Sequence, residues 1–273
     1  LRVAYEPSTT FYLEDRKRRK PWKGTLPFPV QVVSRVEVID KISGGKLTTE
    51  YKYHHGYWDG AEREFRGFGM VEQLDTEIFE DYDGAGLHGE GMPFHRVDET
   101  RFSPPTLTKT WFHQGPVSEA HGDWVELDWT DEYWAGDPHV LGHPETVNRF
   151  LSNLRDRRDR RDALRSLRGR VLRTELYALD GSTVEDRPYT VTESSYGVRE
   201  VDPPADEETD RRRIFFPHSL AQRTTQWERG HEPMTRFAFT GDYDAYGQPR
   251  SQIRIAVPRG RDFRVADAPG EPH

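Results

Sequence analysis

Cysteine is absent from the 273 residues of this sequence, which excludes disulfide bonds, zinc-thiolate sites and thiol nucleophiles. Long apolar runs are also missing. No stretch approaches the roughly 20 residues that span a bilayer, and the first five residues have no signal-peptide core. We therefore expect a soluble chain without direct membrane insertion. Because it begins with Leu1 rather than Met, we interpret it as a piece of a longer protein.

Lysine is scarce, with seven residues in total and none after Lys109. Acidic side chains (47) outnumber basic ones (39), which gives a formal net charge of −8. Most arginines lie close in sequence to Asp or Glu, which is typical of paired, solvated charge rather than of a phosphate-binding stripe. The charge pattern predicts that nucleic acid is not a partner.

Hydrophobic residues make up only 34% of the chain, but aromatic residues reach 12%, with 7 Trp, 12 Tyr and 14 Phe. Such side chains bury large areas, so the composition indicates a folded chain of one large domain or two modest ones. Its clearest pattern has a period of two. Valines at positions 30, 32, 36 and 38 alternate with mostly polar residues, and a Ser-Gly-Gly turn at 43–45 leads into the β-forming segment 47–53.

Residues 30–53 are therefore predicted to form a hairpin, and further strands are predicted at 171–178, 189–201 and 252–257. Apolar residues with helical spacing run from Val147 to Leu154 and resume from Leu164 to Val171. The charged run 155–162 between them is interpreted as a solvated helix face. The expected fold is mostly β, with antiparallel strands and hairpins and one helical segment. A glycine- and proline-rich loop is expected at 80–106, and a second loop with an acidic run at 206–208 is expected at 202–213.

Candidate cofactor sites are weak. Residues 84–89 match the glycine spacing of a dinucleotide loop, but no helix is predicted after them. His139 and His143 have the spacing of a helical zinc pair, but Pro138 and Pro144 predict a loop, so we interpret them as surface histidines. The adjacent His54 and His55 are expected on opposite faces of a strand. We predict no cofactor and no metal.

Tryptophans and carboxylates alternate in segment 122–137. One interpretation is a strand with Val125, Leu127 and Trp129 inward and Glu126 outward. The alternative function is a glycan-binding or glycoside-processing module, because aromatic faces stack on sugars and carboxylates flank the scissile bond. That alternative would use Trp124, Glu126, Asp128, Trp129 and Trp134. No known catalytic motif is present, so we do not predict an enzyme.

The most informative segment is residues 51–71, which indicates a strand, a tight turn at Asp59-Gly60 and a second strand. Gly67 and Gly69 in that second strand suggest that another part of the chain approaches closely. We assign a structural role in the sheet to this motif and to three later positions. The residues are Asp59, Gly60, Glu62, Arg63, Glu64, Phe65, Gly67, Phe68, Gly69, Trp111, His113 and Gly169.

Together with the stretches 26–30, 107–115, 167–181, 188–196 and 243–249, this motif resembles the middle region of the shell-forming B component of bacterial Tc insecticidal toxin complexes, which are related to Rhs and YD-repeat proteins. The resemblance covers most of 3–79, 104–116 and 163–260. It divides the chain into a β-rich segment 1–116 with a glycine-rich loop, a variable Trp-rich insertion and helix at 117–162, and a second β-rich segment 163–273.

This resemblance implies a structural function without catalysis. In the family, antiparallel strands spiral into a hollow shell completed by the C component, which encloses a toxic region. The implied partners are that C component with its enclosed region, and the A-component translocation channel, reached through the gate of the full-length protein. The implied location is a secreted or released toxin complex assembled in the bacterial cytoplasm. Only one YD element occurs here, at 243–247.

Overall fold

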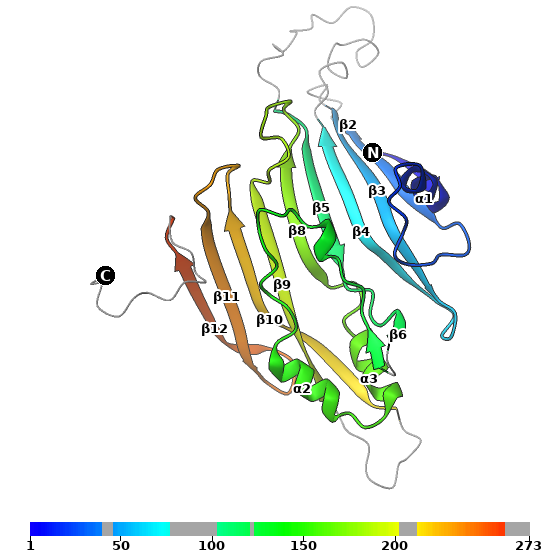
Figure 1. Cartoon of the computed structure of the whole chain (residues 1–273), viewed down its shortest axis with the longest axis vertical. Helices are drawn as coiled ribbons and strands as arrows, with labels where there is room; N and C mark the ends of the chain where they lie inside the picture. The colour runs from blue at the N-terminus through cyan, green and yellow to red at the C-terminus, as the bar shows by residue number, and fades with distance from the viewer. Residues whose placement is uncertain (40–45, 77–102, 121–122, 202–211, 260–273) are drawn as a thin grey trace, which may run out of the picture.

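The computed structural model describes residues 1–39, 46–76, 103–120, 123–201 and 212–259, and for 118–120, 123 and 124 it describes only the backbone. In these residues the main element is an antiparallel sheet of ten strands (Figure 1). Its strands, in spatial order, are β1 (Arg2–Pro7), β2 (Gln31–Ile39), β3 (Lys46–Asp59), β4 (Glu64–Thr76), β5 (Thr106–Phe112), β8 (Val171–Ala178), β9 (Thr190–Val201), β10 (Ile214–Gln226), β11 (Met234–Tyr243) and β12 (Pro249–Val257).

The sheet is an open meander. Strand order follows chain order, every neighbouring pair is antiparallel, and within the described residues β1 and β12 each pair on one side only. The mostly antiparallel β prediction is confirmed. The hairpin expected at 30–53 is the β2–β3 pair, in which Val36 lies opposite Thr49. Its turn at 43–45 lies outside the described residues, as do most of the loops expected at 80–106 and 202–213.

The predicted helical segment divides into α2 (Glu145–Asn153) and α3 (Arg157–Arg165). Leu154 leaves the helical conformation with φ −70° and ψ 112°, and the Asp156 carboxylate caps α3 by accepting a hydrogen bond from the Arg158 amide at 2.8 Å. Val171 begins β8 instead of extending the helix. Two helical elements were not predicted, α1 (Ser8–Lys17) and the short 3-10 helix η3 (Thr130–Glu132).

The chain between β5 and β8 crosses one face of the sheet (Figure 1). We call residues 113–170 the crossing segment. It contains the small hairpin of β6 (Ser118–Ala120) and β7 (Asp123–Val125), then η3, α2 and α3. Two apolar clusters are buried where the crossing segment meets the sheet: Met70, Trp111 and Trp129 form one, and Leu154, Ala163, Leu164, Leu167, Tyr196 and Val198 form the other.

Among the described residues, no helix has both the length and the apolar character needed to cross a lipid bilayer.

Candidate functional site

The predicted motif at the β3–β4 turn is organised around the buried carboxylate of Asp59. One oxygen, Oδ1, accepts hydrogen bonds from the amides of Ala61 (3.0 Å) and Glu62 (3.2 Å), and so closes the turn. The other oxygen pairs with Arg66 and, at 2.8 Å, with Arg161 of α3. Burial alone would raise the pKa of Asp59, but the hydrogen bonds and the two guanidinium groups hold it below its ordinary value. Asp59 therefore links the turn to α3.

The glutamates of the same turn extend this contact along α3. Glu62 pairs with Arg161, and Glu64 pairs with Arg165 (2.8 Å) and Arg168. Arg161 is only 8% exposed, so the interpretation of 155–162 as a wholly solvated helix face is wrong at this residue. The arginine-rich helix instead presents one row of cations to the acidic turn.

Other motif residues shape the turn itself. Gly60 and Arg63 are exposed, and Arg63 adopts a left-handed backbone with φ +53°. Phe65 and Phe68 pack edge to face with ring centroids 5.4 Å apart. No described atom lies within 4 Å of a Cβ built at Gly67, whose φ is +85°. The close approach predicted at Gly67 is therefore wrong, and glycine suits this position because of its backbone conformation.

The crossing segment packs against the sheet at Gly69 and Trp111. A Cβ at Gly69 would lie 2.4 Å from the Trp129 ring, so only glycine leaves room for that indole. Trp111 is fully buried, its indole N–H donates to Glu132 at 3.1 Å, and its ring packs edge-on against Tyr133 with centroids 5.0 Å apart. What approaches Gly69 is a side chain of the crossing segment, not a neighbouring strand.

His113 occupies a fixed position at the end of β5. Its amide donates to the Arg170 carbonyl at 2.9 Å, and its carbonyl accepts from the Gly169 amide at 2.8 Å. Gly169 has φ +78°, a conformation that favours glycine. The His113 ring nitrogen Nδ1 lies 2.9 Å from Glu126 Oε1.

Glu126 joins His113 to His143. Its second oxygen, Oε2, lies 2.7 Å from His143 Nε2. Burial would raise the pKa of Glu126, but the two histidines lower it to about 2, and hydrogen bonding to Glu126 raises the pKa of His143. The interpretation of Glu126 as outward-facing is therefore wrong, and His143 is partly buried rather than fully at the surface. His139 is at the surface, but its Nδ1 lies 2.9 Å from the buried Glu193.

These residues border a cavity of about 150 Å³ between the crossing segment and the sheet. Its wall also includes Tyr133, Ser194 and Ser195. The pair His54 and His55 lies elsewhere, and the two rings are on the same side because His55 has φ +57°, with ring centroids 6.3 Å apart. The expectation of opposite faces is wrong there.

Two of the three tryptophans proposed for sugar binding, Trp129 and Trp134, pack against other aromatic side chains. Trp129 packs against His55 with centroids 4.9 Å apart, and Trp134 packs edge-on against Trp227 at 5.1 Å. Asp128 accepts a hydrogen bond from the Thr130 amide at 2.9 Å, which fixes the start of η3. The Trp124 side chain lies outside the described residues.

The strand predicted over this stretch ends early. Only Asp123–Val125 forms a strand, and Val125 is 40% exposed rather than inward, whereas Trp129 is buried as predicted.

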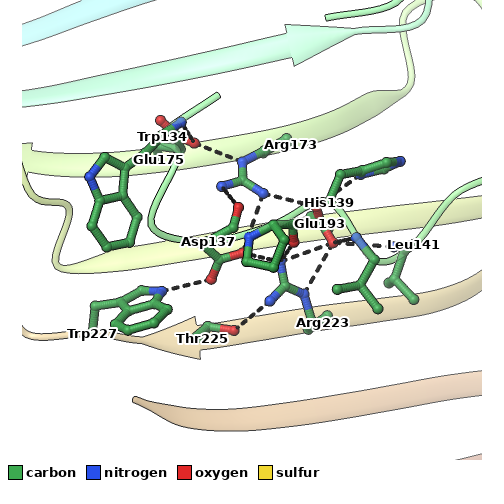
Figure 2. Close-up of polar contacts among 12 residues, drawn as sticks. Trp134, Asp137, His139, Leu141, Arg173, Glu175, Glu193, Arg223, Thr225 and Trp227 are labelled. Carbon is green, nitrogen blue, oxygen red and sulfur yellow. Dashed lines mark hydrogen bonds and ion pairs between the residues drawn. The ribbon is translucent and has the colours of Figure 1, made fainter. Parts of the chain in front are cut away.

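A buried charge network fixes the middle of the crossing segment to β8, β9 and β10 (Figure 2). Arg173 donates to Glu175 (2.7 Å) and Glu193 (2.8 Å), and Arg223 donates to Glu193 (3.1 Å) and Asp137. We call these five residues the central charge network. None is more than 1% exposed.

Neutral donors complete this network. The Trp227 indole N–H donates to Asp137 at 2.6 Å, and the Trp134 amide donates to Glu175 at 2.9 Å. Burial would raise the pKa of Glu193, but His139 and the two arginines lower it to about 2. Sequence analysis did not single out this network. The sequence did contain one indication of this network, namely that charged residues at 173, 175 and 193 lie inside predicted strands.

Comparison with known proteins gives concordant matches. Residues 1–85 match a family model described as insecticide toxin TcdB middle/N-terminal region, and residues 162–270 match the middle/C-terminal region of the same toxin. The chain belongs to the middle region of the Tc toxin B-component family. Residues 86–161 lie outside both family models. No curated protein matches the chain.

Solved Tc toxin structures have the same fold. A TcdB2-TccC3-Cdc42 crystal structure matches with a TM-score of 0.73 and 30% identity, and a Photorhabdus luminescens Tc holotoxin pore matches with 0.71 and 30%. TcdB2-TccC3 without its hypervariable C-terminal region matches with 0.70 and 31% identity. Each alignment covers 98% of this chain but 12% of the solved chain. This chain thus corresponds to a small part of the matched toxin chains.

Proposed function

We propose that this chain is a wall segment of a toxin-enclosing shell in a Tc-type complex and that it has no catalysis of its own. The observation that carries the proposal is the open meander. Strand β12 pairs only with β11 among the described residues, and its Ile253 and Ile255 are 61% and 49% exposed. An unpaired strand with exposed apolar side chains is unfavourable in water unless another strand or chain covers it.

The proposed partners follow from the matched structures. Their titles name TccC3 together with TcdB2, and one describes a holotoxin pore. By similarity, the full-length protein would bind a C component with its enclosed toxic region and would deliver it through an A-component channel. The complex would be assembled in the bacterial cytoplasm and then secreted or released.

The motif residues and the crossing segment have a structural role in this proposal. Asp59, Glu62 and Glu64 hold α3, while Gly69 and Trp111 receive Trp129 and its neighbours. We divide the chain into the β-rich segments 1–116 and 163–273, joined by the insertion 117–162. Support for that division comes from the gap between the two family models at 86–161.

The test is co-purification of the full-length protein with a C component, followed by digestion with an added protease. We expect the enclosed region to be protected. We expect the double variant Ile253→Asp/Ile255→Asp to lose that protection, because charge on β12 opposes strand addition. Tyr246→Asp is the matched control, since Tyr246 is 91% exposed in the β11–β12 turn.

If the wild-type complex forms but its enclosed region is cut as fast as in the free C component, the shell function is wrong. If Tyr246→Asp loses protection as fully as the β12 variant does, the role assigned to β12 is wrong.

A further inference from the structure

The cluster of His113, Glu126 and His143 is not explained by a wall function. We propose that it is a binding site for a divalent transition-metal ion of the zinc class. Imidazole nitrogens and a carboxylate oxygen are ligands that Zn²⁺ accepts, and three protein ligands plus a water molecule form a known type of zinc site. The site would be independent of the shell function.

The positions of the donor atoms fit an ion. One ring nitrogen from each histidine and one Glu126 oxygen all lie within 4.8 Å of one another. Ligand atoms around tetrahedral zinc are about 3.3 Å apart, given zinc–nitrogen bonds of about 2.0 to 2.1 Å. A small rotation of the carboxylate would exchange its two hydrogen bonds for a bond to the ion.

Two of the three ligands come from backbone segments that hydrogen bonds hold in place. The backbone of His113 is held on both sides by Gly169 and Arg170. The loop that carries His143 is held by Ser195, whose hydroxyl donates to the Gly142 carbonyl at 3.0 Å. Preorganised ligands bind a metal more tightly because less ordering is needed on binding.

The surroundings leave space for a fourth ligand. All three residues line the cavity of about 150 Å³ described above, beside the hydroxyl groups of Ser194 and Ser195. A water molecule in this cavity would complete a tetrahedral shell. The bound ion would join the end of β5, the end of β7 and the loop before α2, and so would stabilise the crossing segment by binding only the folded state.

The first experiment is zinc-edge anomalous diffraction from crystals of the full-length protein grown with Zn²⁺. We expect an anomalous peak between the three side chains. A peak at this place would establish the site without any substitution, and the absence of a peak at saturating Zn²⁺ would overturn the proposal. The three residues would then form a hydrogen-bonded clamp without an ion.

The second experiment compares variants in solution. Co²⁺ and Zn²⁺ titrations of the full-length protein should lose one tight site in Glu126→Gln and in His143→Ala. Loss of even an indirect partner costs roughly 10- to 100-fold in metal affinity, so loss of a ligand should cost at least that much. The exposed His231→Ala is the control and should bind like wild type. Equal affinity in all four proteins would contradict the site, and circular dichroism checks that each variant is folded.

Discussion

Two of the charged contacts between the crossing segment and the sheet differ in depth. In the central charge network, Arg173 and Arg223 are at most 1% exposed, and their carboxylate partners are equally buried. At the β3–β4 turn, exposure increases along α3 and into the turn that follows it: the side chain of Arg161 is 10% exposed, that of Arg165 29% and that of Arg168, beyond the end of α3, 39%. The same types of ion pair therefore occur in two different environments.

The difference determines what each pair contributes. A buried charge loses its hydration, so it is tolerated only when partners surround it, and removing one member leaves the others uncompensated. An exposed pair is weakened by water and salt, and its members stay hydrated when the partner is removed. We therefore expect the central charge network to respond to substitution far more strongly than the outer end of α3.

The largest effect is expected for Arg223→Met, which leaves Glu193 and Asp137 without one of their cations. Breaking a buried ion pair by removing one partner costs about 3 to 5 kcal/mol. The free energy of opening β9 and β10, measured by hydrogen–deuterium exchange, should fall by that amount. Arg149→Met, at an exposed pair with Glu145, is the control and should change little. Equal effects of the two substitutions would contradict the comparison.

A third charged contact, between α1 and β3, is buried, but the protonation of its histidine changes with pH. His54 Nδ1 lies 2.6 Å from Asp15 Oδ2, and its other nitrogen faces Glu72 at 3.8 Å. Burial would lower the pKa of His54, but the hydrogen bonds and charges of these carboxylates raise it to about 9 from the ordinary 6.5.

The folded state binds the His54 proton more tightly than the unfolded state does. The contribution of protonated His54 to the free energy of unfolding is therefore complete below pH 6.5 and is lost as the pH rises through 9. The pKa shift of His54 corresponds to a stabilisation of the folded state by roughly 3 kcal/mol at most. Exchange of α1 and β3 peptides, corrected for intrinsic rates, should increase between these pH values, and His54→Gln should remove the pH dependence. Unchanged protection across this range would show that the pair does not stabilise α1.

Gly69→Val tests the apolar part of the interface. The new side chain would displace the Trp129 ring, which lies 2.4 Å from a Cβ at this position, and overpacking of this kind costs about 1 to 3 kcal/mol. Gly67→Asn is the matched substitution, because asparagine tolerates a left-handed backbone and the described surroundings of Gly67 are open. Thermal unfolding should show a clearly larger decrease in the unfolding temperature for Gly69→Val than for Gly67→Asn. A larger loss for Gly67→Asn would contradict the role assigned to Trp129.

Several strands were predictable because their signal is local, whereas β1, β5, β10 and β11 were not predicted. Alternation at 30–38 and β-forming composition at 171–178 correspond to β2 and β8. The partners of the crossing segment were not predictable, because they depend on contacts between distant residues. Glu126 and His143 are separated by 17 positions, and the pairing of Arg161 with Glu62 spans 99. Nothing in one sequence specifies which distant charges meet.

Two misinterpretations have different physical origins. Prolines at 138 and 144 correctly excluded a helix around His143, but a loop packed onto a sheet can still bury its side chains. Gly67 was expected to allow close packing, whereas it provides a left-handed backbone, and sequence alone does not separate these two uses of glycine.

The smallest effect is expected in the turn that follows α3. Arg168→Gln removes one cation from Glu64, which keeps its pair with Arg165 at 2.8 Å. Exposed pairs contribute about 0 to 1 kcal/mol, so the unfolding temperature should change little, and the small difference should disappear at high salt. Arg161→Gln, at a buried position within α3, should cost more and should remain costly in salt, because Asp59 and Glu62 lose a shielded partner. If both variants showed the same salt-sensitive loss, depth would not be the variable that separates the two contacts.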